Sequence, residues 1–417
     1  MAKPKIAILT IRNSYKFGGV LASVHKLYQF CEQYFDPTVF YLSFDPKISV
    51  SLKKFNFKND IRKVDYFGMN AVEVGAKYAF WEPGHYEYSL ELWKKALQGY
   101  DYFFIVSGSN IAGYPLVQLN KKYALSVATV YQDDREQRVK SLSVFRKSID
   151  IFSQLKMKKI EKEIFKNSGY TFTISNYSRK RIDQILGINS HNLAIYGFPV
   201  NVKVKAKQLS QNKNIIAVGR FADPRKNFDM LMQVFKNIYT KDNSIKLYVV
   251  GDKPSKKMLD KFNVQEFYKN IIFTGNLNQN ELDEFYGIAD LMLITSYQEG
   301  LGIIGLEAMA YGLPVVSTNC GGTSDYVINN KTGYLVDIND DKLMAEYALY
   351  ILNSPDIYKN FSENALNFIK DNYSEKKFEA IIKYGLITVY PELSNLFDNK
   401  VVEIENSFIK EQKEINI

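Results

Sequence analysis

The chain has 417 residues, a length that at ~150 residues per domain predicts two or three domains. With 46% apolar and 24% charged residues it has the side chains for large cores, which excludes a disordered or collagen-like chain. Two cysteines far apart and three scattered histidines argue against a disulfide framework or a Cys/His zinc site. No apolar run approaches ~18 residues, so we expect a cytoplasmic chain with no membrane-spanning segment.

The net charge of +9 is unevenly distributed along the chain. Residues 1–200 hold 29 Lys and Arg against 17 Asp and Glu, whereas the remainder holds 25 against 28. The basic character therefore belongs to the N-terminal half.

Short β-rich runs alternate with helical periods in the first half, a pattern typical of parallel α/β architecture. The predicted strands are residues 5–11, 38–42, 102–107, 125–131, 170–174 and 193–196. The polar stretch 198–213 that follows them is predicted to be a linker.

The alternation restarts after the linker. The predicted strands are residues 215–218, 246–250, 271–274, 291–294, 315–317 and 334–336, with helices at 228–238, 279–288 and 341–352. The sequence thus predicts two doubly wound domains, 1–200 and 201–372, and a helical segment 373–417 that packs back on them. An amphipathic period at 378–386 supports that packing, and we expect the charged end 403–417 to fray.

Residues 291–316 form a strand, a glycine-containing turn, a helix and another strand. Gly300 and Gly302 let the turn approach a ligand closely, and the helix that begins near Ile303 offers free N–H groups to an anion. Glu299 in the turn and Glu307 in the helix are predicted to face one crevice at the carboxyl end of a strand, where open α/β sheets bind ligands. A phosphate and a ribose diol are suitable ligands for this crevice.

Two cations flank a second strand–loop–helix segment at residues 215–228. Arg220 follows the strand and Lys226 precedes the helix, so both side chains are predicted to converge on one anion such as a diphosphate. In the first domain, Gly18 and Gly19 follow the first strand without the G-x-G-x-x-G fingerprint of dinucleotide binding. That segment alone favours an ordinary loop.

The stretch EGLGIIGLE, followed by AMAYGLPVVSTNCGGTSDYV and TGYLV, resembles the donor site of the GT-B retaining glycosyltransferases of glycosyltransferase family four. Gly219-Arg220 with Lys226-Asn227 is similar to that family's diphosphate clamp, and FTGNL to its loop beside the nucleobase. The resemblance is strong over residues 214–340 and weak over the first 200. It implies two Rossmann-like domains that face each other across a cleft, the second binding a nucleotide-sugar and the first an acceptor.

The resemblance also implies residue roles. Arg220 and Lys226 would neutralise the leaving diphosphate, and Glu307 would bind the ribose hydroxyls. Glu299 would contact the donor sugar. The remaining implied donor contacts are Gly18, Gly19, Asn276, Leu277, Gly300, Leu301, Gly302 and Ile303. Such enzymes retain anomeric configuration without a metal, so the resemblance implies no cofactor and no metal site.

One loop departs from the family pattern. Many relatives carry a His after the strand that corresponds to residues 125–130, whereas here Tyr131, Gln132 and Asp133 follow it. Either one of these three residues replaces the His contact, or the alignment is shifted, or the activity is altered.

Residues 135–166 hold ten Lys and Arg against four acids, interleaved with apolar side chains. This basic amphipathic pattern is typical of segments that lie on an anionic membrane. It equally fits a helix whose apolar face is core and whose basic face is solvated. No nucleic-acid-binding module is recognisable.

Taken together, the sequence predicts a metal-independent retaining glycosyltransferase that moves a hexose from a nucleoside-diphosphate sugar to a glycan or lipid-linked acceptor in cell-surface polysaccharide, lipopolysaccharide or glycolipid synthesis. We expect it in the cytoplasm, at the inner face of the membrane if residues 135–166 bind lipid. The alternatives are a catalytically silent GT-B binding subunit and a GT-B nucleotide-sugar epimerase.

Overall fold

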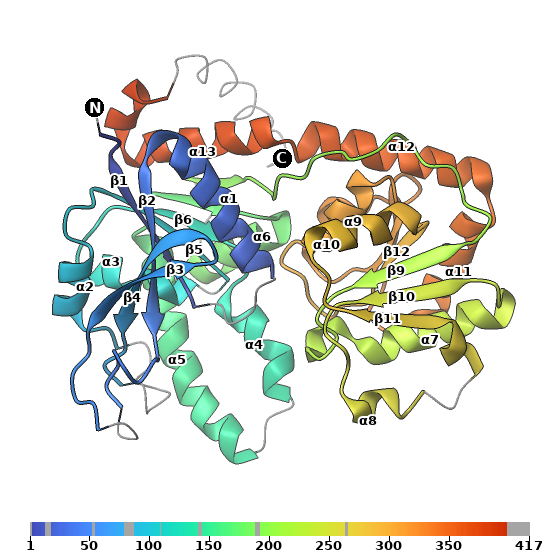
Figure 1. The fold of residues 1–417 in the computed structure, drawn as a ribbon, viewed down its shortest axis with the longest axis horizontal. Coiled ribbons are helices and arrows are strands. Elements are labelled where there is room, and N and C mark those ends of the chain that lie inside the picture. The colour runs from blue at the N-terminus through green and yellow to red at the C-terminus, as the bar shows by residue number, and fades with distance from the viewer. Residues whose placement is uncertain are drawn as a thin grey trace. The chain divides into compact units, whose positions relative to one another are not determined.

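The computed structural model describes residues 2–12, 18–51, 55–78, 87–108, 110–140, 144–187, 192–262 and 266–397. The chain divides into two compact units. The first comprises Met1–Gly197 and Phe378–Ile417, and the second Phe198–Lys377. The chain therefore leaves the first unit once and returns to it in its last helix (Figure 1).

The first unit is built on an eight-stranded sheet in the order β3-β4-β2-β1-β5-β6-β7-β8. Its strands are β1 (Lys5–Thr10), β2 (Asp36–Ser43), β3 (Ile61–Tyr66), β4 (Met69–Gly75), β5 (Tyr102–Ser107), β6 (Ala124–Val127), β7 (Tyr170–Thr173) and β8 (Leu193–Ile195). All pairings are parallel except that of β3 with β4. Its helices are α1 (Gly19–Tyr34), α2 (Leu90–Ala96), α3 (Tyr114–Gln118), α4 (Tyr131–Lys140), α5 (Val144–Lys166) and α6 (Asn176–Leu186), with a 3-10 turn η2 (Asn110–Gly113).

The hairpin of β3 and β4 was absent from the predicted strands. It closes through Phe67 and Gly68, both at positive φ, as tight hairpin turns require. On β4, Glu73 is buried and accepts hydrogen bonds from Tyr41 Oη (2.9 Å) and Arg62 Nε (2.9 Å). Charged residues such as Glu73 and Arg62 interrupt the apolar run by which a buried strand is identified in sequence.

The predicted strand 125–131 is wrong at its end. The strand β6 stops at Val127, and Tyr131 begins α4, where its N–H donates to Glu161 Oε1 at 2.9 Å. A buried carboxylate from α5 thus starts a helix where the sequence suggested a continuing strand.

The second unit has a six-stranded, entirely parallel sheet in the order β11-β10-β9-β12-β13-β14. Its strands are β9 (Asn214–Val218), β10 (Lys246–Val250), β11 (Ile271–Gly275), β12 (Leu291–Ile294), β13 (Val315–Thr318) and β14 (Gly333–Val336). Its helices are α7 (Phe228–Lys241), α8 (Lys256–Leu259), α9 (Gln279–Ile288), α10 (Ile303–Ala310), α11 (Asp341–Leu352) and α12 (Pro355–Asn372), with 3-10 turns η3 (Pro224–Lys226), η4 (Glu266–Asn270) and η5 (Gly322–Asp325). Figure 1 shows α9 and α10 on one face of this sheet and α7 and α11 on the other.

Residues 198–213 have no regular structure, and their side chains hold them against the second unit. Lys207 is half-buried, and its Nζ donates to the carbonyls of Gly287 (2.7 Å) and Ala289 at the end of α9. A cation at a helix C-terminus is favourable. The predicted linker is therefore an ordered segment of the second unit.

The last helix, α13 (Glu375–Val389), and the 3-10 turn η6 (Pro391–Asn395) lie on the first unit. Tyr390 Oη donates to Lys122 O at 2.7 Å and accepts from the N–H of Phe103 at 3.0 Å. The predicted frayed end, 403–417, lies outside the described residues.

Candidate active site

The glycine-containing turn after β12 is held in shape by a buried tyrosine. Gly302 precedes α10 at φ 79°, and its carbonyl accepts a hydrogen bond from Tyr326 Oη at 2.8 Å. A Cβ on Gly305 would lie 2.3 Å from the same hydroxyl, so only glycine fits there. Gly305 N–H donates to Gly302 O at 2.8 Å, and the N–H groups at the start of α10 give the helix the positive end that an anion site requires.

Lys226 and Glu299 form the closest charged pair of the site. Lys226 Nζ lies 2.5 Å from Glu299 Oε1, which also accepts a hydrogen bond from Ser296 Oγ at 2.6 Å. Burial opposes ionisation of Glu299, but the Lys226 ammonium and the Ser296 hydroxyl outweigh it and hold its pKa below the usual range. Glu299 is therefore a carboxylate at neutral pH.

The backbone around both side chains is tied together. Thr295 Oγ1 donates to Lys226 O at 3.1 Å, and the Tyr297 N–H donates to Arg225 O at 2.7 Å. On the other side, Glu299 N–H donates to Cys320 O at 2.8 Å. The loop after β9 and the turn after β12 thus act as one rigid support for the pair.

The three cations of the β9 loop have different environments. Arg225 is held by Asp223, with 2.8 Å between Nη2 and Oδ2, whereas Arg220 reaches the same oxygen only at 3.7 Å. The Arg220 side chain is 38% exposed. Arg225 is accordingly a structural residue, and Arg220 and Lys226 are the cations positioned to meet an anion.

Glu307 lies one turn further along α10, and its partner differs from that of Glu299. It accepts a hydrogen bond from Tyr286 Oη at 3.1 Å. Burial raises the pKa of Glu307 to about 7, with Asp283 adding to the rise and Tyr286 and Lys203 opposing it. The carboxyl group is thus poised between its two protonation states near neutral pH.

The remaining predicted donor contacts are more dispersed. Asn276 is exposed after β11 and donates to Asp252 Oδ1 at 2.7 Å, beside the partly buried Leu277. Gly18 and Gly19 lie at the start of α1, in the other unit.

Asp133 has partners within the first unit. Its carboxylate receives Arg181 Nη2 at 2.7 Å and Tyr177 Oη at 2.7 Å, and its side chain is only 4% exposed. Tyr131 is also buried, and Gln132 lies between Tyr131 and Asp133 in the first turn of α4. Nothing in the composition of residues 131–133 indicates this network, because Arg181 lies 48 residues away.

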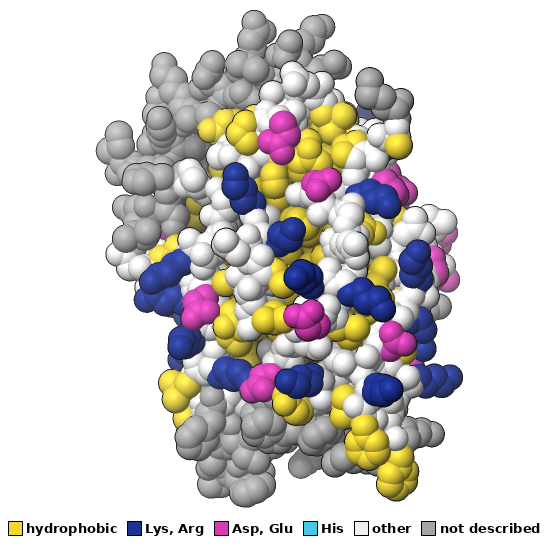
Figure 2. Space-filling model, turned by 90° about the vertical axis from the view of Figure 1, so that its left-hand side faces the viewer, with side chains coloured by type: hydrophobic (Ala, Val, Ile, Leu, Met, Phe, Trp, Pro, Cys, Tyr) yellow, Lys and Arg dark blue, Asp and Glu magenta, His cyan; other side chains and the backbone are white. Residues whose placement is uncertain are grey.

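The basic segment 135–166 spans α4 and α5. Met157, Ile160 and Ile164 of α5 are buried in the core of the first unit, while Ile151 and Leu155 are 57% and 63% exposed. The exposed lysines are Lys158, Lys159, Lys162 and Lys166. Figure 2 shows Lys and Arg spread with Asp and Glu among them on one face of the molecule. The segment therefore has a core face and, among the described residues, an outer face with lysines and two apolar side chains, and its binding to a membrane stays a prediction.

Sequence reasoning missed Ser296, Tyr286 and Tyr326 as supports of the site. Tyr286 and Tyr326 are wholly buried, yet each donates its hydroxyl to the α10 segment. A buried tyrosine next to a catalytic loop is indistinguishable from a core aromatic in sequence.

The described residues contain neither a cluster of metal ligands nor a helix that could span a membrane. No three His, Cys, Asp or Glu side chains there are grouped as a metal ion would need. None of the helices in that part of the chain combines the length and the apolar character needed to cross a bilayer.

Known proteins resemble this chain in sequence and in fold. Residues 201–368 match the family described as Glycosyl transferases group 1. The capsular polysaccharide biosynthesis glycosyltransferase CapM of Staphylococcus aureus is 25% identical over 244 residues, which are 57% of this chain and 59% of CapM. The chain thus spans less than two thirds of the length of this relative.

Solved structures resemble both units. Sucrose-phosphate synthase from Thermosynechococcus elongatus has a TM-score of 0.71 at 17% identity, covering 95% of this chain and 100% of the other. HepE of Anabaena in complex with UDP-glucose has a TM-score of 0.68 at 13% identity, covering 92% and 99%. These similarities show the GT-B fold, two Rossmann-like domains with a helical C-terminal segment. The match to the glycosyl transferases group 1 family covers residues 201–368, which make up most of the second unit.

Proposed function

We propose that the chain is a retaining glycosyltransferase that moves a hexose from a nucleoside-diphosphate sugar to a glycan or lipid-linked acceptor. The observation that carries the proposal is the buried Lys226–Glu299 pair, supported on two loops beside the positive end of α10. A paired cation and carboxylate next to a helix N-terminus suit a ligand with both a diphosphate and a sugar.

The charges support a division of roles. In transfer, negative charge grows on the leaving diphosphate, and Arg220 and Lys226 would stabilise it. When the diphosphate binds, Lys226 would share its ammonium between phosphate and Glu299. Glu299 would then hold a hydroxyl of the donor sugar, with Gly300, Leu301 and Ile303 contributing backbone N–H groups.

Glu307 would bind the ribose. A carboxylate accepts hydrogen bonds from both hydroxyls of a diol, and Tyr286 keeps this one in place. The exposed Asn276 and its neighbour Leu277 would lie beside the nucleobase of the donor.

We propose that transfer proceeds without a metal and with retention, by attack on the same face of the sugar. In this scheme the bond between the anomeric carbon and the diphosphate oxygen breaks, its electron pair leaves with the nucleoside diphosphate, and the acceptor oxygen bonds to the anomeric carbon while a phosphate oxygen of the donor takes the acceptor's proton. Two cations and the α10 N-terminus would supply the positive charge that a divalent ion supplies in other transferases.

The acceptor is proposed to belong to cell-surface polysaccharide, lipopolysaccharide or glycolipid synthesis, a proposal supported by the similarity to CapM, a capsular polysaccharide biosynthesis glycosyltransferase. On α5, Ile151 and Leu155 are exposed together with four lysines, and such a face suits an anionic membrane surface. We place the enzyme in the cytoplasm, at the inner face of the membrane.

A panel of UDP, GDP, ADP and CMP with their common sugars, with and without magnesium, tests the donor site by thermal shift, because ligand binding raises apparent stability. One nucleoside diphosphate should stabilise the protein without magnesium, and its sugar should be slowly hydrolysed to the same anomer. Absence of any shift would favour a silent subunit, and interconversion of the free donor would favour an epimerase.

Vesicle sedimentation tests the membrane proposal separately. The protein should sediment with anionic vesicles and less with neutral ones, and a Leu155→Ser, Lys159→Ser variant should sediment less. Equal sedimentation of the variant would remove α5 from the proposal.

A further inference from the structure

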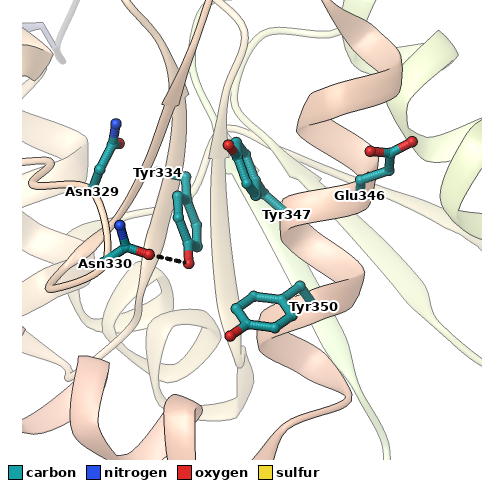
Figure 3. Close-up of a pocket in the computed structure, with 6 residues that line it drawn as sticks. All are labelled: Asn329, Asn330, Tyr334, Glu346, Tyr347 and Tyr350. Atoms are coloured by element: carbon teal, nitrogen blue, oxygen red, sulfur yellow. Dashed lines mark hydrogen bonds between the residues drawn. The ribbon is translucent and has the colours of Figure 1, made fainter.

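The second unit has a pocket that the proposed function does not use. It has a volume of about 380 Å³, within the range of about 300–1,000 Å³ typical of small-molecule sites. Its lining residues are Asn329, Asn330, Tyr334, Glu346, Tyr347 and Tyr350 (Figure 3).

The pocket lies away from the donor site within the same unit. Asn329 and Asn330 belong to the turn that enters β14, at the amino edge of a parallel sheet. The loops that carry Arg220 and Glu299 leave β9 and β12 at the carboxyl edge. A ligand here would therefore be a second occupant and not part of the donor.

The asparagine wall is rigid. Asn330 has φ 62°, a conformation that asparagine tolerates, and a Cβ on Gly333 would lie 1.7 Å from Val315 O. Asn329 Oδ1 accepts a hydrogen bond from the Leu335 N–H at 2.8 Å, and Asn330 Oδ1 accepts one from Tyr334 Oη at 2.8 Å. Because both amide oxygens are used, each residue presents its NH₂ group as a donor.

The rest of the lining is mainly aromatic. The rings of Tyr334 and Tyr347 stack with centroids 4.0 Å apart and planes 8° from parallel, and Tyr350 lies edge-on to Tyr334 at 6.2 Å. Figure 3 shows Tyr347, Tyr350 and Glu346 projecting from one helix, α11. Tyr350 is 46% exposed, so its ring is accessible to a ligand.

Glu346 completes the set with an acceptor. Within the described part of the chain, no hydrogen bond or ion pair involves its exposed carboxylate. The pocket therefore offers two fixed amide donors, a carboxylate acceptor and a ring face. A pyranose has the matching pattern, since its hydroxyls both donate and accept and its C–H face packs on an aromatic ring.

A quaternary ammonium group is the rival ligand, since tyrosines with a carboxylate also form cation cages. Two observations disfavour it. Asn329 and Asn330 keep their amide NH₂ groups as hydrogen-bond donors, which a quaternary ammonium group cannot accept, and Tyr334 is only 6% exposed, with Tyr347 stacked on its face. Fewer than three rings remain available to surround a cation.

We propose that this pocket is a second saccharide-binding site, which holds a pyranose unit of a glycan against Tyr350 between Glu346 and the two asparagines. The proposal agrees with a glycan as acceptor, yet saccharide binding here requires no transfer at the donor site. A glycan held by such a site would stay attached between successive encounters with the donor site, raising its effective concentration.

Saturation-transfer NMR on the full-length protein tests this with maltotriose, N-acetylglucosamine and choline chloride as probes. At least one saccharide should bind, and Tyr350→Ala should weaken that binding roughly fivefold or more, the scale of a lost ring contact. Tyr350→Phe keeps the ring and should bind like the unchanged protein. Glu346→Ala should also weaken binding, whereas Glu284→Ala, at an exposed position on α9, should not.

Three results would overturn the proposal: no saccharide probe binds, Tyr350→Ala binds the saccharide unchanged, or choline binds in place of the saccharides. Nucleotide thermal shifts on the same variants distinguish a failure of the saccharide site from a failure of the proposed function. A variant that loses saccharide binding but keeps the nucleotide shift is affected in this pocket. A variant that loses only the nucleotide shift is affected in the donor site.

Discussion

Lys226 and Glu299 gain their chemistry from a balance between burial and pairing. Each side chain is about 85% buried, and neither charge would be stable there without the other. Such a pair is ready for an anionic ligand, because a phosphate adds a second negative partner to an ammonium that is already desolvated and fixed.

Replacing Lys226 tests that role. Lys226→Ala should lower turnover by roughly 10²–10³-fold, because the leaving diphosphate loses one preorganised cation. Turnover is measured with the donor that the nucleotide panel identifies. The control is Lys261→Ala, which removes an exposed pair with Asp229 and should leave turnover unchanged. Equal turnover in both variants would exclude Lys226 from catalysis.

In the proposed donor site, Glu307 would make nucleotide binding dependent on pH. Its pKa of about 7 means that the carboxylate predominates above pH 7 and the neutral acid below it. If the carboxylate accepts the ribose hydroxyls, affinity for the nucleoside diphosphate should rise up to about tenfold from pH 6 to pH 8. Isothermal titration across this range measures the rise.

Glu307→Gln separates this carboxyl from the ligand's own titration. The variant has no ionisable group at this position, so its pH profile reports the phosphate and the rest of the site. The two profiles should diverge around pH 7. Parallel profiles would mean that Glu307 does not bind the nucleotide.

At the scale of elements, the position of α10 depends on the small residues that let Tyr326 approach it. Gly305→Ala would place a Cβ 2.3 Å from Tyr326 Oη and 2.7 Å from its Cε2. We expect a loss of about 1–3 kcal/mol in the free energy of unfolding, as overpacked cores show, and weaker nucleotide binding because the helix N-terminus moves. Urea unfolding and the nucleotide shift measure both effects.

Gly287 supplies a matched control. It lies in α9, and a Cβ there would meet nothing within 4 Å. Gly287→Ala should therefore stabilise the protein slightly, because alanine favours helix by up to ~1 kcal/mol. If both substitutions had the same effect, the contact with Tyr326 would not be what constrains α10.

The elements of the second unit were the most predictable from sequence. Strands β10 and β12 and helices α9 and α11 begin and end where the sequence predicts, since buried parallel strands are continuous apolar runs and helices keep their period. Strand β3 was missed because Arg62 and Lys63 interrupt its apolar pattern, and its stability depends on Glu73 and Tyr41 from other strands. Interactions between distant residues leave no local signal.

At the scale of the whole molecule, the chain's path couples its end to its beginning. Phe378 packs on Tyr196, Tyr384 on Tyr170 and Tyr390 on Tyr102, all within the first unit. Sequence indicated an amphipathic helix here but not which unit it covers, because an apolar stripe does not identify the surface it meets.

A substitution in α13 should therefore destabilise the unit that is distant in sequence. A Cβ on Gly385 would lie 2.2 Å from Phe172 Cζ on β7, so Gly385→Val should force the helix away from the first unit. Hydrogen exchange should accelerate in β5, β6 and β7 while the strands of the second unit keep their protection, because local stability follows the contacts of each unit. Thr388→Ala, at an exposed position of the same helix, should leave both patterns unchanged. Nucleotide binding should persist in Gly385→Val, since Lys226, Glu299 and Glu307 all lie in the second unit, and loss of protection there instead would mean that α13 stabilises both units.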